Sequence, residues 1–259
     1  MTRPVFLAED LVLYADDLGV GDLARLQGAE GRHAATVRRI ATGEILDVVD
    51  GRGLRLTCEV LASDRDGLDL RVVGSAREEE PRPRLVLVQA LAKGGRDEQA
   101  VESATEIGVD GVIPWQADRS IVRWPASKAA RGRAKWQSVV RAAAKQSRRS
   151  RIPDVREVLD TRGLVSIVRG LVDEGGAALV CHEEGERSLA AWGETQWERL
   201  RGGPEVALVV GPEGGISPEE LDALREAGAE VVLLGPHVLR SANAGPAAAV
   251  LLSAALHRW

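Results

Sequence analysis

The stretch VALVVGPEGGISPEELDALREAGAEVVLLGPHVLRSAN, residues 206–243, decides the fold that we expect for this chain. Its first five residues, 206–210, are apolar and mostly β-branched, which is typical of a buried strand. They are followed at 211–215 by Gly-Pro-Glu-Gly-Gly, whose three glycines permit backbone angles and close approaches that side chains forbid. The stretch therefore begins as a strand that ends in a tight loop.

Helix signals follow the glycine loop directly. Ser217 is the predicted N-cap, Pro218 takes the first helical position, and Glu220 completes an S-x-x-E capping box. Gly228 ends this helix, and a second apolar run at 231–234 predicts a strand that leads into a Gly-Pro loop. Two loops therefore leave the carboxyl ends of two strands, which is the edge where open α/β sheets bind ligands.

Neither loop carries a known nucleotide fingerprint. The pattern G-x-G-x-x-G is absent, and no G-K-[ST] follows the glycines as a P-loop requires. Taken alone, the glycine loop is compatible with an ordinary strand-to-helix turn. Paired with LGPHVLRSANAG at 234–245, it resembles the cofactor loops of the SPOUT class of knotted RNA methyltransferases. Within that class the chain resembles the ribosomal RNA small subunit methyltransferase E family, which methylates N3 of a uridine in 16S ribosomal RNA.

The resemblance extends over most of the chain. HAATVRR at 33–39 and DGRG at 50–53 look like the signature of the family's RNA-binding domain, and EIGV at 106–109 fits its catalytic domain. Lys145 stands where an acidic residue is common in the family. The second loop departs from the usual family sequence at His237, Ser241, Ala242 and Asn243.

The resemblance implies that the two loops bind S-adenosylmethionine. Glycine loops can present backbone amide and carbonyl groups to such a ligand, while apolar side chains form the walls of its pocket. A predicted strand at 177–181 should bring the residue after it to the same rim. The cofactor-binding residues implied in this way are His182, Val210, Gly211, Glu213, Gly214, Gly215, Leu234, Gly235, Val238 and Leu239.

Arg240 is the predicted catalytic residue. Uracil N3 carries a proton at neutral pH, so the site must favour its anion, and an always-charged guanidinium group can donate to O2 or O4. His237, Glu213 and Glu106 are candidate bases on grounds of charge. A structural alternative, in which Arg240 pairs with Glu213 to hold the loops together, stays open. Because N3 lies on the pairing edge, the target uridine must be unpaired or flipped out.

Charge is unevenly distributed along the chain. The net charge is −5, yet residues 119–153 contain eleven Lys or Arg and no Asp or Glu. This asymmetry favours a basic RNA-binding surface on an otherwise acidic protein, although a basic helix face is often only solvated. The predicted RNA-binding residues are Arg32, His33, Arg39, Arg141, Lys145, Arg148, Arg149 and Arg151.

The pattern of elements predicts two domains. Residues 1–75 contain short apolar segments between turn residues, at 11–14, 45–49, 54–61 and 68–73, and DGRG at 50–53 predicts a hairpin between two of them. This pattern favours a small β-barrel, and the resemblance implies that the barrel is PUA-like. Residues 76–84 are charged and punctuated by prolines, as in a linker. In residues 85–259 strands alternate with helices, the last from about 245 to 257, which favours an α/β fold with a covered parallel sheet. The resemblance implies that this second domain is a SPOUT domain with a trefoil knot.

Several other classes of protein are disfavoured. Charged residues among the first ten argue against a signal peptide, and the longest apolar run, 247–256, is too short to span a bilayer. Cys58 and Cys181 are isolated, so we expect a reduced, cytoplasmic protein without a metal site. The resemblance implies a homodimer, because SPOUT cofactor sites lie against a subunit interface.

Other functions stay open. The departures at 237 and 241–243 would suit a non-catalytic RNA-binding or ribosome-assembly factor whose SPOUT domain has lost activity. The same domain could also methylate another RNA site. A nucleotide-dependent oxidoreductase is disfavoured by the missing fingerprint and by the basic segment.

Overall fold

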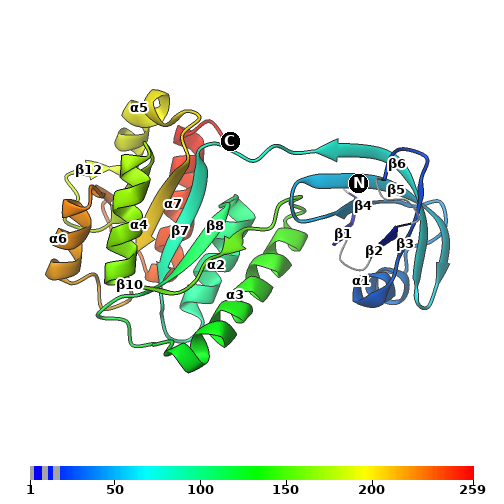
Figure 1. Cartoon of the computed structure of the whole chain (residues 1–259), viewed down its shortest axis with the longest axis horizontal. Helices are drawn as coiled ribbons and strands as arrows, with labels where there is room; N and C mark the ends of the chain where they lie inside the picture. The colour runs from blue at the N-terminus through cyan, green and yellow to red at the C-terminus, as the bar shows by residue number, and fades with distance from the viewer. Residues whose placement is uncertain (1–2, 8–10, 14–17) are drawn as a thin grey trace. The chain divides into compact units, whose positions relative to one another are not determined.

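The computed structural model describes residues 3–7, 11–13 and 18–259 (Figure 1). The chain forms two compact units. The first comprises residues up to Glu80 together with Ala144–Ile152, and the second comprises Pro81–Ala143 and Pro153–Trp259. The domain boundaries expected from the sequence, after residues 75 and 84, stay a prediction. The sequence pattern had not indicated that 144–152 groups with the first unit.

The first unit is built on a mainly antiparallel sheet. Its elements are β1 (Val5–Leu7), β2 (Leu11–Leu13), β3 (Leu23–Leu26), α1 (Gly28–Arg32), the π-helical turn η2 (His33–Val37), β4 (Ile45–Val49), β5 (Leu54–Asp64) and β6 (Gly67–Arg77). In the described residues the strand order is β1-β4-β5-β6-β3-β2, and only β1 pairs in parallel with its neighbour. The strands predicted at 11–14, 45–49, 54–61 and 68–73 are confirmed in the described residues as β2, β4, β5 and β6, and β1 and β3 are additional to them.

A hairpin and an alternating strand define the core of this unit. The turn between β4 and β5 is held by Asp50, whose carboxylate accepts from the backbone N–H groups of Arg52 (2.6 Å) and Leu54 (2.9 Å). The hairpin predicted there is confirmed. Because side chains of a strand alternate between faces, Leu56 and Val60 of β5 both point into the buried core.

Residues 144–152 belong to the first unit through specific contacts. The ammonium group of Lys145 donates to both carboxylate oxygens of Glu30, at 2.7 and 2.8 Å. Arg151 donates to the backbone oxygen of Glu78 at 2.8 Å, and the N–H of Ile152 donates to the backbone oxygen of Gly51 at 2.9 Å. This segment is therefore part of the framework of the first unit.

The second unit contains a parallel sheet. Its strands are β7 (Arg84–Ala90), β8 (Gly111–Gln116), β9 (Asp154–Val155), β10 (Leu159–Asp160), β11 (Ala177–Cys181), β12 (Arg187–Ser188), β13 (Glu205–Val210) and β14 (Glu230–Leu233). The main order is β10-β8-β7-β13-β11-β14-β12, with β9 beside β8, and each of these pairs is parallel. The parallel sheet predicted from alternating strands and helices is confirmed.

Helices cover both faces of this sheet (Figure 1). They are α2 (Arg96–Ile107), α4 (Thr161–Asp173), α5 (Leu189–Leu200), α6 (Pro218–Glu226) and α7 (Ser241–Ala255). A further helix, α3 (Ala126–Gln146), belongs to this unit as far as Ala143. Val86 and Val88 of β7 pack in the core under α4 and α6. Leu87 and Gln89 alternate to the opposite face, where α7 approaches so closely that a Cβ on Gly245 would lie 3.0 Å from Leu87. Helices α2 and α5 pack against α7 on that side.

The last helix differs from its predicted range. It begins at Ser241 rather than near Gly245, and Pro246 lies inside it. The backbone oxygen of Arg240 accepts from the N–H groups of Asn243 (2.8 Å) and Ala244 (3.0 Å), and these bonds start the helix four residues earlier than expected. Residues 241–243, expected in a loop, therefore form its first turn.

We predict that a glutamate-specific protease cuts first after Glu79. This residue is exposed and lies in a segment without helix or strand, between β6 and β7. The two fragments should nevertheless elute together from a size-exclusion column, because 144–152 is part of the first unit. A denaturing gel should show both fragments in that peak. Separate elution of the fragments under native conditions would contradict this division of the chain.

Candidate functional site

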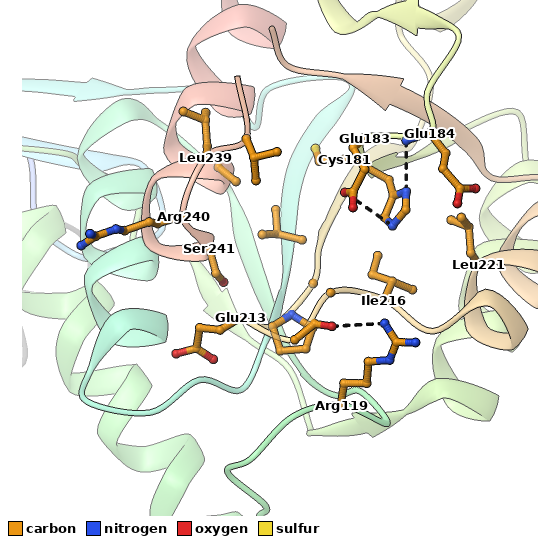
Figure 2. A pocket seen from close by; sticks show the side chains of 18 of the residues that line it. Arg119, Cys181, Glu183, Glu184, Glu213, Ile216, Leu221, Leu239, Arg240 and Ser241 are labelled. Atoms are coloured by element: carbon orange, nitrogen blue, oxygen red, sulfur yellow. Dashed lines mark hydrogen bonds and ion pairs between the residues drawn. The ribbon is translucent and has the colours of Figure 1, made fainter. Parts of the chain in front are cut away.

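A cavity of about 680 Å³ lies at the carboxyl edge of the parallel sheet (Figure 2). Three adjacent strands end there, since Cys181 at the end of β11 pairs with Val210 of β13 and Val232 of β14. The residues that follow these strands form the cavity walls. A neighbouring cavity of about 300 Å³, lined by the loop after β14, shares several residues with the first.

The glycine loop after β13 forms one wall, and its glycines have different roles. Gly215 has φ = 75°, in the left-handed region, and its N–H donates to the backbone oxygen of Pro212 at 2.9 Å. Gly211 is needed for space, because a Cβ there would lie 2.7 Å from Ile216. A Cβ on Gly214 would lie 3.2 Å from that of Arg119. The loop is thus a tight turn with little room for side chains.

The carboxylate of Glu220 anchors this loop to the rest of the unit. Glu220 is 2% exposed and accepts from the backbone N–H of Ser217 at 3.0 Å, which confirms the predicted capping box. It also accepts from the N–H of Asp118 (2.8 Å) and the hydroxyl of Thr161 (2.6 Å). One buried carboxylate therefore fixes the positions of three segments that are distant in sequence.

Two arginines that line the cavity bind the glycine loop. Arg119 donates to the backbone oxygen of Gly214 at 3.2 Å, as the dashed line in Figure 2 shows. Arg96, the first residue of α2, donates to the carboxylate of Glu213 at 3.0 Å. Glu213 therefore has a cationic partner other than Arg240. The structural alternative, in which Arg240 pairs with Glu213, is not what the structure contains.

The loop after β14 forms the opposite wall. Val238 is 85% exposed and Leu239 is 39% exposed, so both present apolar surface at the cavity. Arg240 is the N-cap of α7, makes no side-chain capping bond, and is exposed at the cavity. Among the described residues its guanidinium group has no hydrogen-bond or ion-pair partner. This charge is therefore available to a ligand.

The segment after β11 contributes His182 and two carboxylates. The Nδ1 atom of His182 accepts from the backbone N–H of Glu184 at 3.2 Å, so in the neutral ring the proton resides on Nε2. That Nε2 lies 3.7 Å from a carboxylate oxygen of Glu183. Burial raises the pKa of the neighbouring Cys181 thiol to about 12, which keeps it uncharged. This wall combines two acidic side chains with a neutral thiol.

The predicted cofactor residues come together at these cavities. Arg240 and most of the ten predicted cofactor residues line the larger cavity, while Leu234 and Gly235 line the smaller one. Of the candidate bases, Glu213 and His237 lie at a cavity, and Glu106 is exposed on α2 without lining either of them. Additional lining residues that we had not predicted include Arg96, Arg119, Cys181, Glu183, Glu184, Ile216, Leu221 and Ser241.

Most of these additional residues follow or precede a strand end. Arg96 follows β7 and Arg119 follows β8, so the rule that loops at the carboxyl edge bind ligands could have indicated both. Glu183 and Glu184 continue the segment in which His182 was predicted. Ser241 was not predicted, because it is one of the positions where the second loop departs from the usual family sequence.

The residues at the cavities fit the predicted cofactor chemically. S-adenosylmethionine is a mid-sized ligand with cationic sulfonium and ammonium groups, and cavities of about 300–1,000 Å³ hold such ligands. Backbone groups of the glycine loop, the apolar side chains of Leu234 and Val238, and the carboxylates of Glu183 and Glu184 offer complementary surfaces.

Three of the predicted RNA-binding residues are exposed arginines of the first unit. They are Arg32 in α1, Arg39 after η2, and Arg148 after α3. The described part of the chain gives their guanidinium groups no hydrogen-bond or ion-pair partner. These three charges are therefore available to phosphate groups.

The other predicted RNA-binding residues take part in internal contacts. Lys145 and Arg151 join 144–152 to the first unit, as described above. The ring of His33 lies 6.4 Å from that of the buried Phe6. Arg141 and Arg149 are half-buried and have interaction partners. The sequence pattern could not separate this structural group from the exposed one, because both consist of basic residues in the same segments.

The described residues carry neither a membrane span nor a metal cluster. None of their helices is long and apolar enough to cross a membrane. Within the same residues, His, Cys, Asp and Glu side chains form no group of three or more that could hold a metal ion.

Comparison with known proteins relates both units to RNA methyltransferases. A family model described as RNA methyltransferase domain matches residues 78–253, and one described as RNA methyltransferase PUA domain matches residues 26–73. The ribosomal RNA small subunit methyltransferase E of Mycobacterium bovis is 44% identical to this chain over 250 residues. The match covers 96% of this chain and 93% of that protein.

Two solved structures share the fold over nearly the whole chain. One is a ribosomal RNA small subunit methyltransferase E from Neisseria gonorrhoeae bound to S-adenosylmethionine, with a TM-score of 0.79, 24% identity and 98% of each chain covered. The other is a Legionella pneumophila protein described as a methyltransferase in complex with the cofactor, with a TM-score of 0.77, 25% identity and the same coverage. The predicted fold class, a SPOUT-type α/β domain after a PUA-like domain, is confirmed. The trefoil knot itself stays a prediction.

We predict that Gly215→Ala destabilises the protein more than Gly235→Ala does. A Cβ in the left-handed region costs about 1–2 kcal/mol, and Gly215 has such a backbone conformation. Gly235 is a matched control in the facing loop, because its φ is not in that region and no atom lies within 4 Å of an added Cβ. Urea unfolding of the two variants measures the difference. Equal unfolding free energies would contradict the assigned role of Gly215.

Proposed function

The chain belongs to the ribosomal RNA small subunit methyltransferase E family, and we propose that it methylates N3 of a uridine in 16S ribosomal RNA with S-adenosylmethionine as the methyl donor. The observation that carries this proposal is the cavity at the carboxyl edge of the sheet, where a glycine loop faces Arg240, a charge without a partner among the described residues. Similarity to the M. bovis relative over almost the whole chain supports the RNA substrate. The cofactor-bound L. pneumophila neighbour supports the methyl donor.

We propose that the cofactor lies between the glycine loop and the loop after β14. It supplies a methyl group on a positively charged sulfur. Glu183 would face its positive charges, together with Glu184, which also pairs with Arg225 at 3.5 Å. The apolar recess around Leu234 and Val238 would hold its adenine ring. The short side-chain-free turn at Gly214 and Gly215 would let backbone groups reach the ribose.

Arg240 is the proposed catalytic residue in this arrangement. As N3 of the uracil loses its proton, negative charge spreads to O2 and O4, and a nearby guanidinium group stabilises that charge. Because Arg96 holds Glu213, no carboxylate of the glycine loop neutralises Arg240. Of the candidate bases, Glu106 lies outside the cavities, Glu213 is paired with Arg96, and His237 lines only the smaller cavity. We therefore propose that water at the exposed mouth of the larger cavity takes the N3 proton.

We propose that the exposed arginines of the first unit bind the RNA backbone. Arg32, Arg39 and Arg148 lie in the same compact unit, which matches the RNA methyltransferase PUA domain in part of its length. Phosphate contacts of this kind give affinity and a strong dependence on salt. A ribosomal RNA substrate also implies that the protein acts in the cytoplasm.

We further propose that the protein is a homodimer. The SPOUT resemblance implies one, and the exposed apolar side chains of Val238 and Leu239 beside the cavity support an interface there. Sedimentation equilibrium tests this directly, since a dimer has twice the 27.7 kDa mass of the chain. A monomer at micromolar concentration would contradict it.

We predict that Arg240→Ala lowers single-turnover methylation of small-subunit RNA about 10²–10³-fold, which is typical for losing one donor to a developing negative charge. Affinity for S-adenosylhomocysteine, measured by calorimetry, should hardly change. Arg162→Ala is the matched control, because Arg162 is an exposed arginine of α4 that does not line the cavity. Near-normal methylation by Arg240→Ala would exclude the catalytic role. Absence of any heat with the wild-type protein would favour a non-catalytic RNA-binding factor instead.

Replacing Arg32, Arg39 and Arg148 together with Glu should weaken RNA binding. On single-stranded RNA the triple substitution should also change the dependence of the association constant on salt. The slope of its logarithm against the logarithm of the salt concentration should become shallower by about 0.7 for each phosphate group that the variant no longer neutralises. The charge-matched control replaces Arg162, Arg169 and Arg201, three exposed arginines of the second unit. Titration of labelled RNA at several salt concentrations measures both variants. Equal reductions in the two variants would mean that net charge alone, rather than this surface, determines binding.

A further inference from the structure

The hydroxyl group of Ser241 is a second polar group at the centre of the site. Ser241 is the first residue of α7, is 8% exposed and lines the larger cavity. Figure 2 shows its oxygen directed away from α7 and into the cavity. This hydroxyl is thus held by buried surroundings while it faces the space proposed for the reacting groups.

Gln89 sets the orientation of this hydroxyl. Gln89 lies in β7 at the middle of the parallel sheet, is 0% exposed, and belongs to the face that α7 covers. Its amide nitrogen donates to the Ser241 oxygen at 2.9 Å and to the backbone oxygen of Ala90 at 3.2 Å. Its own side-chain oxygen is buried without a hydrogen-bond partner among the described residues. A fully buried amide is costly in a sheet core, so its bond to Ser241 is a feature to be explained.

The hydrogen bonds that Ser241 already makes leave its hydroxyl proton free to be donated into the cavity. A serine hydroxyl has one O–H and two lone pairs. The amide N–H of Gln89 occupies one lone pair, and a group that donates cannot at the same time accept the serine proton. The described residues offer that proton no other acceptor. The O–H of Ser241 therefore remains to be donated to a ligand in the cavity.

The surroundings of this O–H favour negative charge on its acceptor. Helix α7 has fifteen residues, and its N-terminus carries partial positive charge, although the N–H groups of Asn243 and Ala244 already bond to the backbone oxygen of Arg240. Arg240, the residue before Ser241, makes no side-chain capping bond and adds a full positive charge. An oxygen that gains negative charge during a reaction would thus meet a hydroxyl donor, a guanidinium group and a helix N-terminus.

We propose that Ser241 donates a hydrogen bond to a carbonyl oxygen of the target uracil, O2 or O4, which gains negative charge when N3 loses its proton, and that Gln89 is its positioning residue. The inference rests on the proposed function. In this reaction N3 loses its proton to water, and the charge left behind spreads onto O2 and O4. The N3 lone pair then forms a bond to the methyl carbon, while the carbon–sulfur bond breaks and its electron pair stays on sulfur. The hydrogen bond is strongest while the ring is anionic, so it lowers the barrier.

The experiment compares Ser241→Ala with Ser253→Ala. Ser253 is a matched control, because it is a buried serine of the same helix that does not line the cavity. Single-turnover methyl transfer to small-subunit RNA is measured from about pH 6 to pH 10, and affinity for S-adenosylhomocysteine is measured by calorimetry. We expect the rate of Ser241→Ala to fall about 10²-fold near neutral pH, as for removal of one donor. Its cofactor affinity should match that of Ser253→Ala.

The pH profile distinguishes this role from a structural one. Without the donor the uracil anion is less stable while the protonated base is unaffected, so the apparent pKa of N3 in the complex rises. A hundredfold loss corresponds to a shift of about two pH units, and Ser241→Ala should regain rate as the pH increases. Gln89→Met, which keeps the side-chain volume but removes the donor, should shift the profile in the same direction by less. If Ser241→Ala fails to fold, the pH profile of Gln89→Met tests the inference instead.

Several outcomes would overturn the inference. An unchanged rate and pH profile in Ser241→Ala would exclude the hydrogen bond to the base. A loss of S-adenosylhomocysteine affinity equal to the loss of rate would assign the hydroxyl to the cofactor instead. Wild-type protein that binds S-adenosylhomocysteine but transfers no methyl group to small-subunit RNA would overturn the proposed function, and the inference with it.

Discussion

The buried carboxylate of Glu220 is the interaction on which the site depends. It lies at the start of α6 and binds the N–H of Ser217 in its own helix, the N–H of Asp118 after β8, and the hydroxyl of Thr161 at the start of α4. A carboxylate that is 2% exposed is tolerated only when donors surround it. These donors come from segments about 40 to 100 residues apart in sequence, so the carboxylate holds three segments together. The position of the glycine loop therefore depends on these hydrogen bonds as well as on its glycines.

The opposite face of the sheet is tied to the cavity by a different kind of contact. Small residues of α7 allow the helix to approach β7 closely, and within this narrow space Gln89 reaches Ser241. A buried polar pair is more directional than apolar packing, because it fixes which way a hydroxyl points. The packing of α7 onto the sheet therefore also fixes the orientation of the Ser241 hydroxyl at the cavity.

Sequence reasoning succeeded where the signal is local. The capping box at Ser217 and Glu220, the apolar runs of the strands and the turn at Asp50 are short-range patterns, and the structure contains them as expected. It failed where distant residues meet. The sequence around Arg96 does not indicate that it pairs with Glu213, and the sequence around Gln89 does not indicate its bond to Ser241. Lys145 has the sequence context of an exposed basic residue, but in the structure it pairs with Glu30. The start of α7 was placed about four residues too late, because Ser241 and Asn243 were assigned to the preceding loop.

The contribution of 144–152 to the first unit has a consequence for biosynthesis. Domains commonly fold as units in the order in which they leave the ribosome. Here the partners of Glu30 and Glu78 are Lys145 and Arg151, which emerge only after β7, α2, β8 and most of α3 have been made. The first unit therefore lacks these contacts while much of the second unit is synthesised, although its hydrophobic core is already complete in sequence by Val72. Its last stabilising segment reaches it from the middle of the chain.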